Sequence, residues 1–202
     1  MNEKEPKLYG LVLGGGKSTR MGTDKRLLKY YEVSQQQHAY NLLSKVCENT
    51  FLSVREEQIS SSERGLNVIV DENKCGGPFN GILSAHNAYP DVAWLVLACD
   101  LPLLDRETLT ILVTARNPGK AATSMATRKT NLPEPLITIW EPQGLKKAKK
   151  DLECSKNSCP RKFLLNSQID LAYPKNDEVL FNANSKTDFE YIQTKLNSAV
   201  HG

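Results

Sequence analysis

The sequence lacks any hydrophobic run that approaches the ~18 residues of a membrane-spanning helix. It also lacks a Cys-x-x-Cys pair, and its five cysteines are scattered and odd in number. A structural zinc site and a disulfide framework are therefore not expected, because both depend on regular cysteine spacing. We expect reduced thiols, as in a cytoplasmic protein.

The N-terminal residues 1–7 are charged and lack the apolar core of a signal peptide. We expect them to be disordered and the chain, residues 1–202, to form a single cytoplasmic domain, monomeric or weakly homo-oligomeric. The net charge of +3 is too small to indicate nucleic acid. We therefore expect neither a nucleic-acid partner nor a membrane partner.

A covalent nucleophile is not indicated either. His38, His86 and His201 lie far apart, and none has a serine or cysteine partner at a telling spacing. The Gly-x-Ser-x-Gly elbow of the α/β-hydrolases is missing as well. We interpret the histidines as structural or surface residues.

What the sequence does have is a glycine loop with cations, directly after an apolar run at residues 8–13. Residues 13–25 read LGGGKSTRMGTDK. Gly14, Gly15 and Gly16 allow close approach to a ligand, because no Cβ stands in the way, and bare N–H groups can point at phosphate oxygens. Positive charge around the loop comes from Lys17, Arg20 and Lys25. The loop predicts polyphosphate binding.

Two common nucleotide motifs do not fit this loop. A P-loop requires a glycine five residues before Gly16, where Leu11 stands. A dinucleotide-binding fingerprint requires a small residue where Thr19 stands, and an acidic residue at the end of the next strand, which instead ends in Arg55. An Asn-Lys-x-Asp segment, expected of a GTPase switch, is also missing.

Apolar runs alternate with helical patterns along the chain, which predicts a parallel sheet with helices on both faces. The predicted strands are residues 8–13, 50–54, 66–70, 94–99, 120–126 and 136–140. The predicted helices are residues 35–47, 78–89, 106–115 and 185–196. The lysine-rich residues 144–160 are interpreted as a solvated helix face rather than a ligand-binding patch. We therefore expect an α/β fold, a three-layer Rossmann-like and mostly parallel sheet.

In such sheets, ligands bind outside the carboxyl ends of the strands. Asp100 follows the most apolar strand, and a carboxylate opposite a phosphate loop suits Mg²⁺. Asp71 follows another strand and suits a ribose hydroxyl, loop ordering or metal. Gly77 and Gly81 allow either a nucleobase to lie on backbone or a tight turn.

On these residues the chain resembles the MobA-type nucleotidyltransferases, whose loop reads L-A-G-G-x-S-x-R-M-G-x-D-K. Gly14 replaces the alanine of that pattern. Further segments agree in order: the residues from Asp71 to Gly81, WLVLACDLP at 94–102, PEPL at 133–136 and NANSKTD at 182–188. The resemblance spans about residues 8–196. Two positions depart from it: Lys186 stands in place of a proline, and residues 53–55 lack the family's asparagine.

The resemblance implies the fold of the nucleotide-diphospho-sugar transferases and a reaction between GTP and molybdopterin with Mg²⁺. The product would be the guanine dinucleotide form of the molybdenum cofactor, with pyrophosphate released. It further implies that Asp100 holds Mg²⁺ as a catalytic residue and that Lys25 and Arg20 neutralise phosphate charge. The nucleotide-binding residues would be Leu13, Gly14, Gly15, Gly16, Lys25, Asp71, Gly77 and Gly81, with Asn182 and Asn184 on the acceptor or metal side.

Three alternatives stay open at this point. One is a cytidylyltransferase for the same cofactor, and another is a sugar-1-phosphate nucleotidyltransferase. The third, of a different class, is a non-catalytic nucleotide-binding module that delivers cofactor. Molybdenum-insertion and molybdoenzyme-maturation proteins are the partners that the resemblance suggests.

Overall fold

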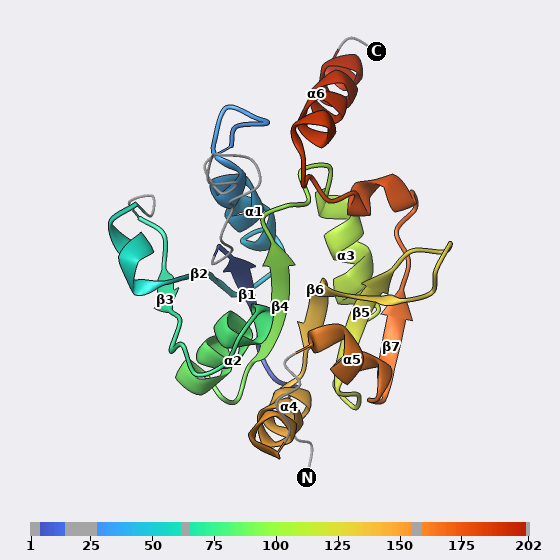
Figure 1. The fold of residues 1–202 in the computed structure, drawn as a ribbon. Helices are drawn as coiled ribbons and strands as arrows, with labels where there is room; N and C mark the ends of the chain where they lie inside the picture. Colours follow the sequence, from blue (N-terminus) through green and yellow to red (C-terminus); the bar gives the residue numbers. More distant parts are fainter. Residues whose placement is uncertain (1–4, 15–27, 62–64, 155–158, 201–202) are drawn as a thin grey trace.

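The computed structural model describes residues 5–14, 28–61, 65–154 and 159–200. Its centre is a seven-stranded sheet in the order β3-β2-β1-β4-β6-β5-β7 (Figure 1). The strands are β1 (Leu8–Leu13), β2 (Asn49–Val54), β3 (Val68–Val70), β4 (Ala93–Ala98), β5 (Ala122–Ala126), β6 (Pro133–Trp140) and β7 (Ile169–Ala172).

The sheet is mostly parallel, as expected, with β6 as the one reversed strand in the described sheet. β1 pairs in parallel with β2 and β4, and β2 pairs in parallel with β3. β6 pairs antiparallel with β4 and β5, and β5 pairs in parallel with β7. The carboxyl ends of β1 to β4 therefore lie at one edge, which is where α/β sheets place their ligands.

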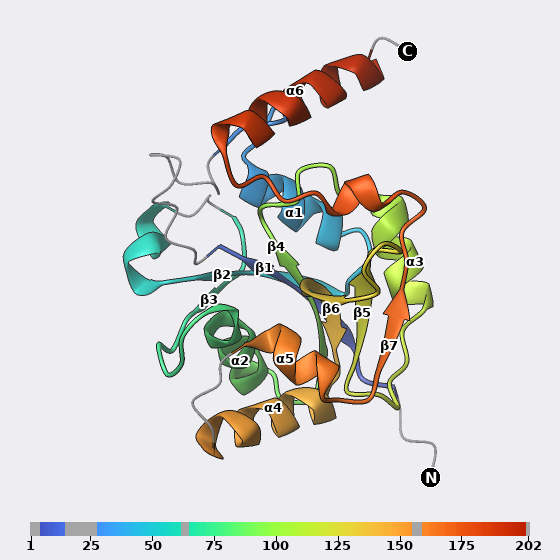
Figure 2. The same ribbon diagram turned by 45° about the vertical axis from the view of Figure 1, so that its right-hand side comes forward.

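Helices cover both faces of the sheet (Figure 2). On one face, α1 (Gln35–Leu43) and α3 (Arg106–Thr114) share a buried cluster with the strands. On the other face are α2 (Pro78–Ala88), α4 (Pro142–Cys154) and α5 (Pro160–Leu165). β4 is buried along its whole length because it is covered on both sides, which explains its uninterrupted apolar sequence. The predicted three-layer arrangement is confirmed.

Capping side chains fix the first residues of two helices. Asp105 accepts a hydrogen bond from the N–H of Thr108 at 2.7 Å, so α3 begins where the sequence indicates. The final helix, α6 (Lys186–Val200), begins with a reciprocal cap. Asp188 accepts from the N–H of Ser185, and the Asp188 N–H donates to the Ser185 hydroxyl.

Several boundaries differ from the prediction. α1 ends at Leu43 rather than at residue 47, because the chain turns at Ser44, although Val46 and Cys47 still pack on the core. β3 is shorter than residues 66–70. The sequence patterns did not indicate α5, β7 or the two 3₁₀ segments, η2 (Glu56–Ser61) and η3 (Asp177–Leu180). These elements are short, and short elements carry little periodicity.

The lysine-rich segment is an amphipathic helix over most of its length. Leu145 and Ala148 of α4 are fully buried, whereas Lys146, Lys147 and Lys149 are exposed. The interpretation of a solvated helix face is therefore confirmed for α4. No helix in the described ranges is long and apolar enough to cross a membrane.

We expected residues 1–7 to be disordered, but Pro6 and Lys7 are held by hydrogen bonds. The Pro6 carbonyl accepts a hydrogen bond from Arg116 at 2.9 Å, and the Lys7 carbonyl accepts one from the N–H of Ala93 at 2.9 Å. Arg116 also binds the fully buried Glu141 through two contacts, at 2.7 and 3.0 Å. The start of the chain is thus tied to a buried ion pair and to β4. Residues 1–4 lie outside the described part.

Candidate active site

Leu13, Ser53, Asp71 and Gly81 meet at the carboxyl edge of the sheet, although they come from four different segments of the chain. A Cβ placed on Gly81 would lie 2.3 Å from Ser53 Oγ, 2.8 Å from Leu13 Cδ2 and 3.3 Å from Asp71 Oδ1. Only glycine fits here, because real Cβ atoms do not approach other heavy atoms so closely. Three residues predicted to bind nucleotide, Leu13, Asp71 and Gly81, are therefore brought together.

Asp71 is a buried carboxyl group held by Ser53. The Ser53 hydroxyl donates a hydrogen bond to Asp71 Oδ1 at 2.6 Å. Burial raises the pKa of Asp71, while hydrogen bonds from Ser53 and Asn80 and the charge of Arg55 oppose that rise. The carboxyl group is an oriented acceptor, suited to the N–H or O–H groups of a base or ribose.

The first glycine of the phosphate loop is fixed to the same place. The Gly14 N–H donates to the carbonyl of Ser53 at 3.0 Å, which continues the β1–β2 pairing into the loop. Ser53 therefore contacts the loop through its backbone and Asp71 through its side chain. The start of the glycine loop therefore lies next to Asp71.

The turn into α2 is also built on glycine. Gly77 has a φ of 69°, in the left-handed region that favours glycine, and precedes Pro78 without a side-chain cap. Ser84 accepts from the N–H of Glu72 at 2.9 Å, which ties the segment after Asp71 to the helix. Asp71, Gly77 and Gly81, all predicted to bind nucleotide, thus lie on a strand end and a helix start that are bonded to each other.

Asp100 lies two residues beyond the end of β4 and is half-buried. Its carbonyl accepts the N–H of Ala183 at 2.9 Å, which brings the loop carrying Asn182 and Asn184 to the end of β4. Residues distant in sequence therefore meet at the end of β4, and the assignment of Asp100 to a metal stays a prediction.

The oxygen donors at this place fit Mg²⁺. Carboxylate and amide oxygens are the ligands that this ion prefers, and it is usually held by one or two carboxylates together with substrate phosphates. Within the described ranges, no group of three or more histidine, cysteine or acidic side chains gathers.

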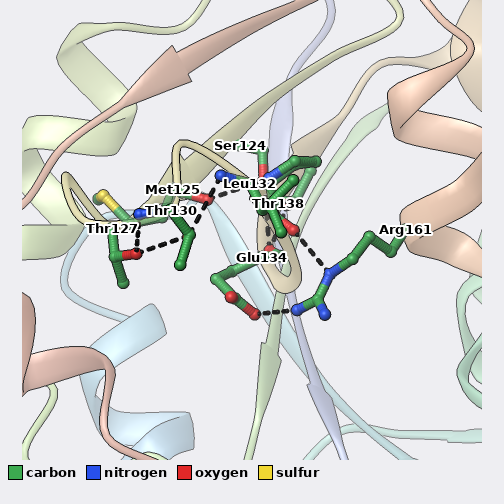
Figure 3. Close-up of polar contacts among 9 residues, drawn as sticks. Ser124, Met125, Thr127, Thr130, Leu132, Glu134, Thr138 and Arg161 are labelled. Atoms are coloured by element: carbon green, nitrogen blue, oxygen red, sulfur yellow. Dashed lines mark hydrogen bonds and ion pairs between the residues drawn. The ribbon is translucent and has the colours of Figure 1, made fainter.

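The PEPL segment has a structural part that the sequence did not reveal. Arg161 of α5 donates to the Pro133 carbonyl at 3.1 Å and to Glu134 Oε2 at 2.7 Å (Figure 3). Thr138 donates to the Glu134 carbonyl at 2.7 Å and lies 2.7 Å from the Ser124 hydroxyl. These contacts hold the start of β6 against α5 and β5.

The other predicted residues fall outside the described part of the chain. Gly15, Gly16, Arg20 and Lys25 belong to residues 15–27, which the structure does not describe. Their assignment to nucleotide binding stays a prediction.

Residues 10–171 match the model of the MobA-like NTP transferase domain. The chain belongs to this family. Its resemblance to the MobA-like proteins, inferred from the glycine loop and the strand-end residues, is confirmed, and the chain is a nucleotidyltransferase.

Two relatives support the assignment. The chain is 37% identical over 186 residues to a "Molybdenum cofactor biosynthesis bifunctional protein" of Synechocystis, covering 92% of this chain and 53% of the relative. It therefore spans about half the length of that protein. It is 28% identical to a "Probable molybdenum cofactor guanylyltransferase" of Thermococcus sibiricus, covering 94% of this chain and 99% of the relative.

A solved structure shows the same fold. Molybdopterin-guanine dinucleotide biosynthesis protein A of Archaeoglobus fulgidus superposes with a TM-score of 0.76 at 19% identity, covering 94% of this chain and 99% of that chain. The expected fold class is therefore confirmed, and the likeness in fold is clear although only 19% of the residues are identical.

Sequence reasoning noted Ser53 only as a departure from the MobA-like pattern, not as part of the site. A serine near a strand end carries no motif, so its role became visible only from its contacts with Asp71 and Gly14. Asn80, which helps to hold Asp71, was missed for the same reason.

Proposed function

We propose that this chain transfers GMP from GTP to the terminal phosphate of molybdopterin, which forms the guanine dinucleotide cofactor and releases pyrophosphate. The observation that carries this proposal is the convergence of Leu13, Ser53, Asp71 and Gly81 at one sheet edge, with Asp100 at the end of the neighbouring strand β4. The names of the two relatives support the choice of nucleotide and acceptor.

The chemistry is an in-line displacement at phosphorus. An oxygen of the acceptor phosphate attacks the α-phosphorus of GTP, a new P–O bond forms, and the bond to the β-phosphate breaks. The electron pair leaves with pyrophosphate, so no covalent intermediate on the protein is required. Catalysis then rests on alignment and on stabilisation of developing charge.

Each part of the site has a proposed task. Asp71 would accept hydrogen bonds from the guanosine, and the backbone at Gly77 and Gly81 would let the nucleoside approach closely. Asp100 would hold Mg²⁺, which supplies charge stabilisation at the phosphate oxygens. Lys25 and Arg20 would add positive charge along the phosphates.

The acceptor side rests on neutral amides. Asn182 and Asn184 flank Ala183, whose N–H binds the Asp100 carbonyl. An amide can orient an anionic phosphate without repelling it and can also offer an oxygen to a metal. This loop is the proposed place where the acceptor phosphate meets the nucleotide.

The deciding experiment is release of pyrophosphate by the purified chain with Mg²⁺ and molybdopterin, with GTP and CTP compared in parallel. We expect release with GTP and little with CTP. Preference for CTP would make the chain a cytidylyltransferase. Nucleotide binding without pyrophosphate release, with any nucleotide, would instead support a cofactor-delivery module.

A further inference from the structure

The hydroxyl of Tyr30 is buried and has no hydrogen-bond partner within the described ranges. Tyr30 is only 8% exposed, and its ring packs against Phe189 with centroids 4.9 Å apart. A buried hydroxyl without a partner costs free energy, and in native proteins such groups call for an explanation. Its neighbour Tyr31 differs, because the Tyr31 hydroxyl donates to the Pro102 carbonyl at 2.7 Å.

Tyr30 packs against the segment that meets Asp100, the residue assigned to the proposed metal and phosphate site. Tyr30 packs in one buried cluster with Ala183, whose N–H binds the Asp100 carbonyl at 2.9 Å. Burial, and then the negative charges of Asp188 and Asp100, raise the pKa of Tyr30 to about 12. The phenol is therefore protonated at neutral pH and can donate a hydrogen bond.

A neutral donor suits a place where the negative charges of Asp188 and Asp100 are felt. A lysine there would pair with Asp100 and would compete with a cation bound to that carboxylate. A phenol supplies an O–H without neutralising Asp100. The atom that accepts from it must itself tolerate the negative surroundings, as a phosphate oxygen does when its charge is shared with a bound cation.

We propose that Tyr30 is a further substrate-contacting residue, whose hydroxyl donates a hydrogen bond to a phosphate oxygen held at Asp100. This inference rests on the proposed nucleotidyl transfer. The oxygen belongs either to GTP or to the acceptor phosphate, and the chemistry of the contact is the same for both.

The test is Tyr30→Phe, which removes the hydroxyl and keeps the ring. The matched control is Tyr31→Phe, which removes a satisfied hydroxyl one residue away. We expect Tyr30→Phe to unfold at the same temperature as the wild type or higher, and kcat/KM to fall on the order of tenfold or more. Tyr31→Phe should show the reverse: a lower unfolding temperature and nearly unchanged kinetics.

Two further measurements identify the substrate that accepts the hydrogen bond. Calorimetric titration with GTP and Mg²⁺ should show weaker binding to Tyr30→Phe if the oxygen belongs to the nucleotide. If the oxygen belongs to the acceptor, GTP affinity stays the same and the KM for molybdopterin rises. Either result supports a contact between Tyr30 and phosphate.

Unchanged kinetics and unchanged ligand affinity in Tyr30→Phe would overturn the inference, whether or not its unfolding temperature rises. This outcome is distinct from failure of the proposed function. If the wild type releases no pyrophosphate with GTP, the titration is repeated with ATP, CTP and UTP. Equal affinity of the wild type and Tyr30→Phe for whichever nucleotide binds would then count against the contact.

Discussion

Ser53 and Asp71 are joined by a 2.6 Å hydrogen bond between the ends of two neighbouring strands. The same serine holds the first glycine of the loop through its carbonyl. One small side chain thus orients the acceptor that we assign to the nucleoside, while its backbone sets where the phosphate loop begins.

Replacing Ser53 with alanine should weaken GTP binding about tenfold, because Asp71 loses the donor that orients it. The lost hydrogen bond to a charged group should also cost about 1.5–3 kcal/mol of unfolding free energy. Ser44→Ala serves as the control, since its hydroxyl donates only to an exposed helix carbonyl. Urea unfolding and GTP titration measure both effects. An unchanged GTP affinity would remove Ser53 from the site.

Asp71→Asn should make the protein more stable at neutral pH and weaken GTP binding. The folded protein raises the pKa of Asp71, so its stabilising effect is complete below the usual carboxyl pKa near 3.8 and is lost as pH rises through the folded-state value. At neutral pH the buried carboxylate therefore opposes folding, and the amide does not. Unfolding temperatures measured from pH 3 to pH 8 should diverge as pH rises; parallel curves would contradict this.

Gly81→Ala should abolish GTP binding. The new methyl group would lie 2.3 Å from Ser53 Oγ, so Ser53 and Asp71 would have to move. Alanine gains about 1 kcal/mol in helix propensity, but overpacking costs about 1–3 kcal/mol, so the net stability change should be small or negative. Gly144→Ala is the contrasting variant: its Cβ would lie 2.0 Å from the Ala121 carbonyl, outside the site. It should lose stability yet bind GTP whenever folded.

Asp100→Ala should abolish pyrophosphate release while leaving the unfolding temperature of the ligand-free protein close to that of the wild type. The reason is loss of the carboxylate that we assign to Mg²⁺. The stabilisation that GTP gives in thermal unfolding should also cease to depend on Mg²⁺. Asp91→Ala, at an exposed aspartate, is the control. Full activity of Asp100→Ala with Mg²⁺ present would end the metal assignment.

Much of the fold could be predicted because its strands and longer helices carry strong local patterns. The first strand, Leu8–Leu13, and the start of α3 at Arg106 are examples. The direction of β6 could not be predicted, since an apolar strand reads alike in parallel and antiparallel pairs. The short α5 and β7 have too few residues for periodicity.

Candidate site residues could be predicted where few residue types can occupy the position. Glycine at position 81 and carboxylates after strands are such cases. The proposed roles of Ser53 and Tyr30 could not be predicted, because serine and tyrosine serve in many environments and only their neighbours suggest a task. Ser53 is recognised by its bond to Asp71, and Tyr30 by the lack of any bond to its hydroxyl within the described part of the chain.

Because β6 runs in the reverse direction, the β5–β6 hairpin and the start of α4 lie at opposite edges of the sheet. The hairpin between β5 and β6 lies at the same edge as Asp100, whereas α4 starts where β6 ends, at the opposite edge (Figure 1). The exposed lysines of α4 can therefore diverge among relatives at little chemical risk. Residues 127–132 lie at the same sheet edge as the proposed site, so we expect acceptor preference to be able to shift there while the nucleotide half stays fixed.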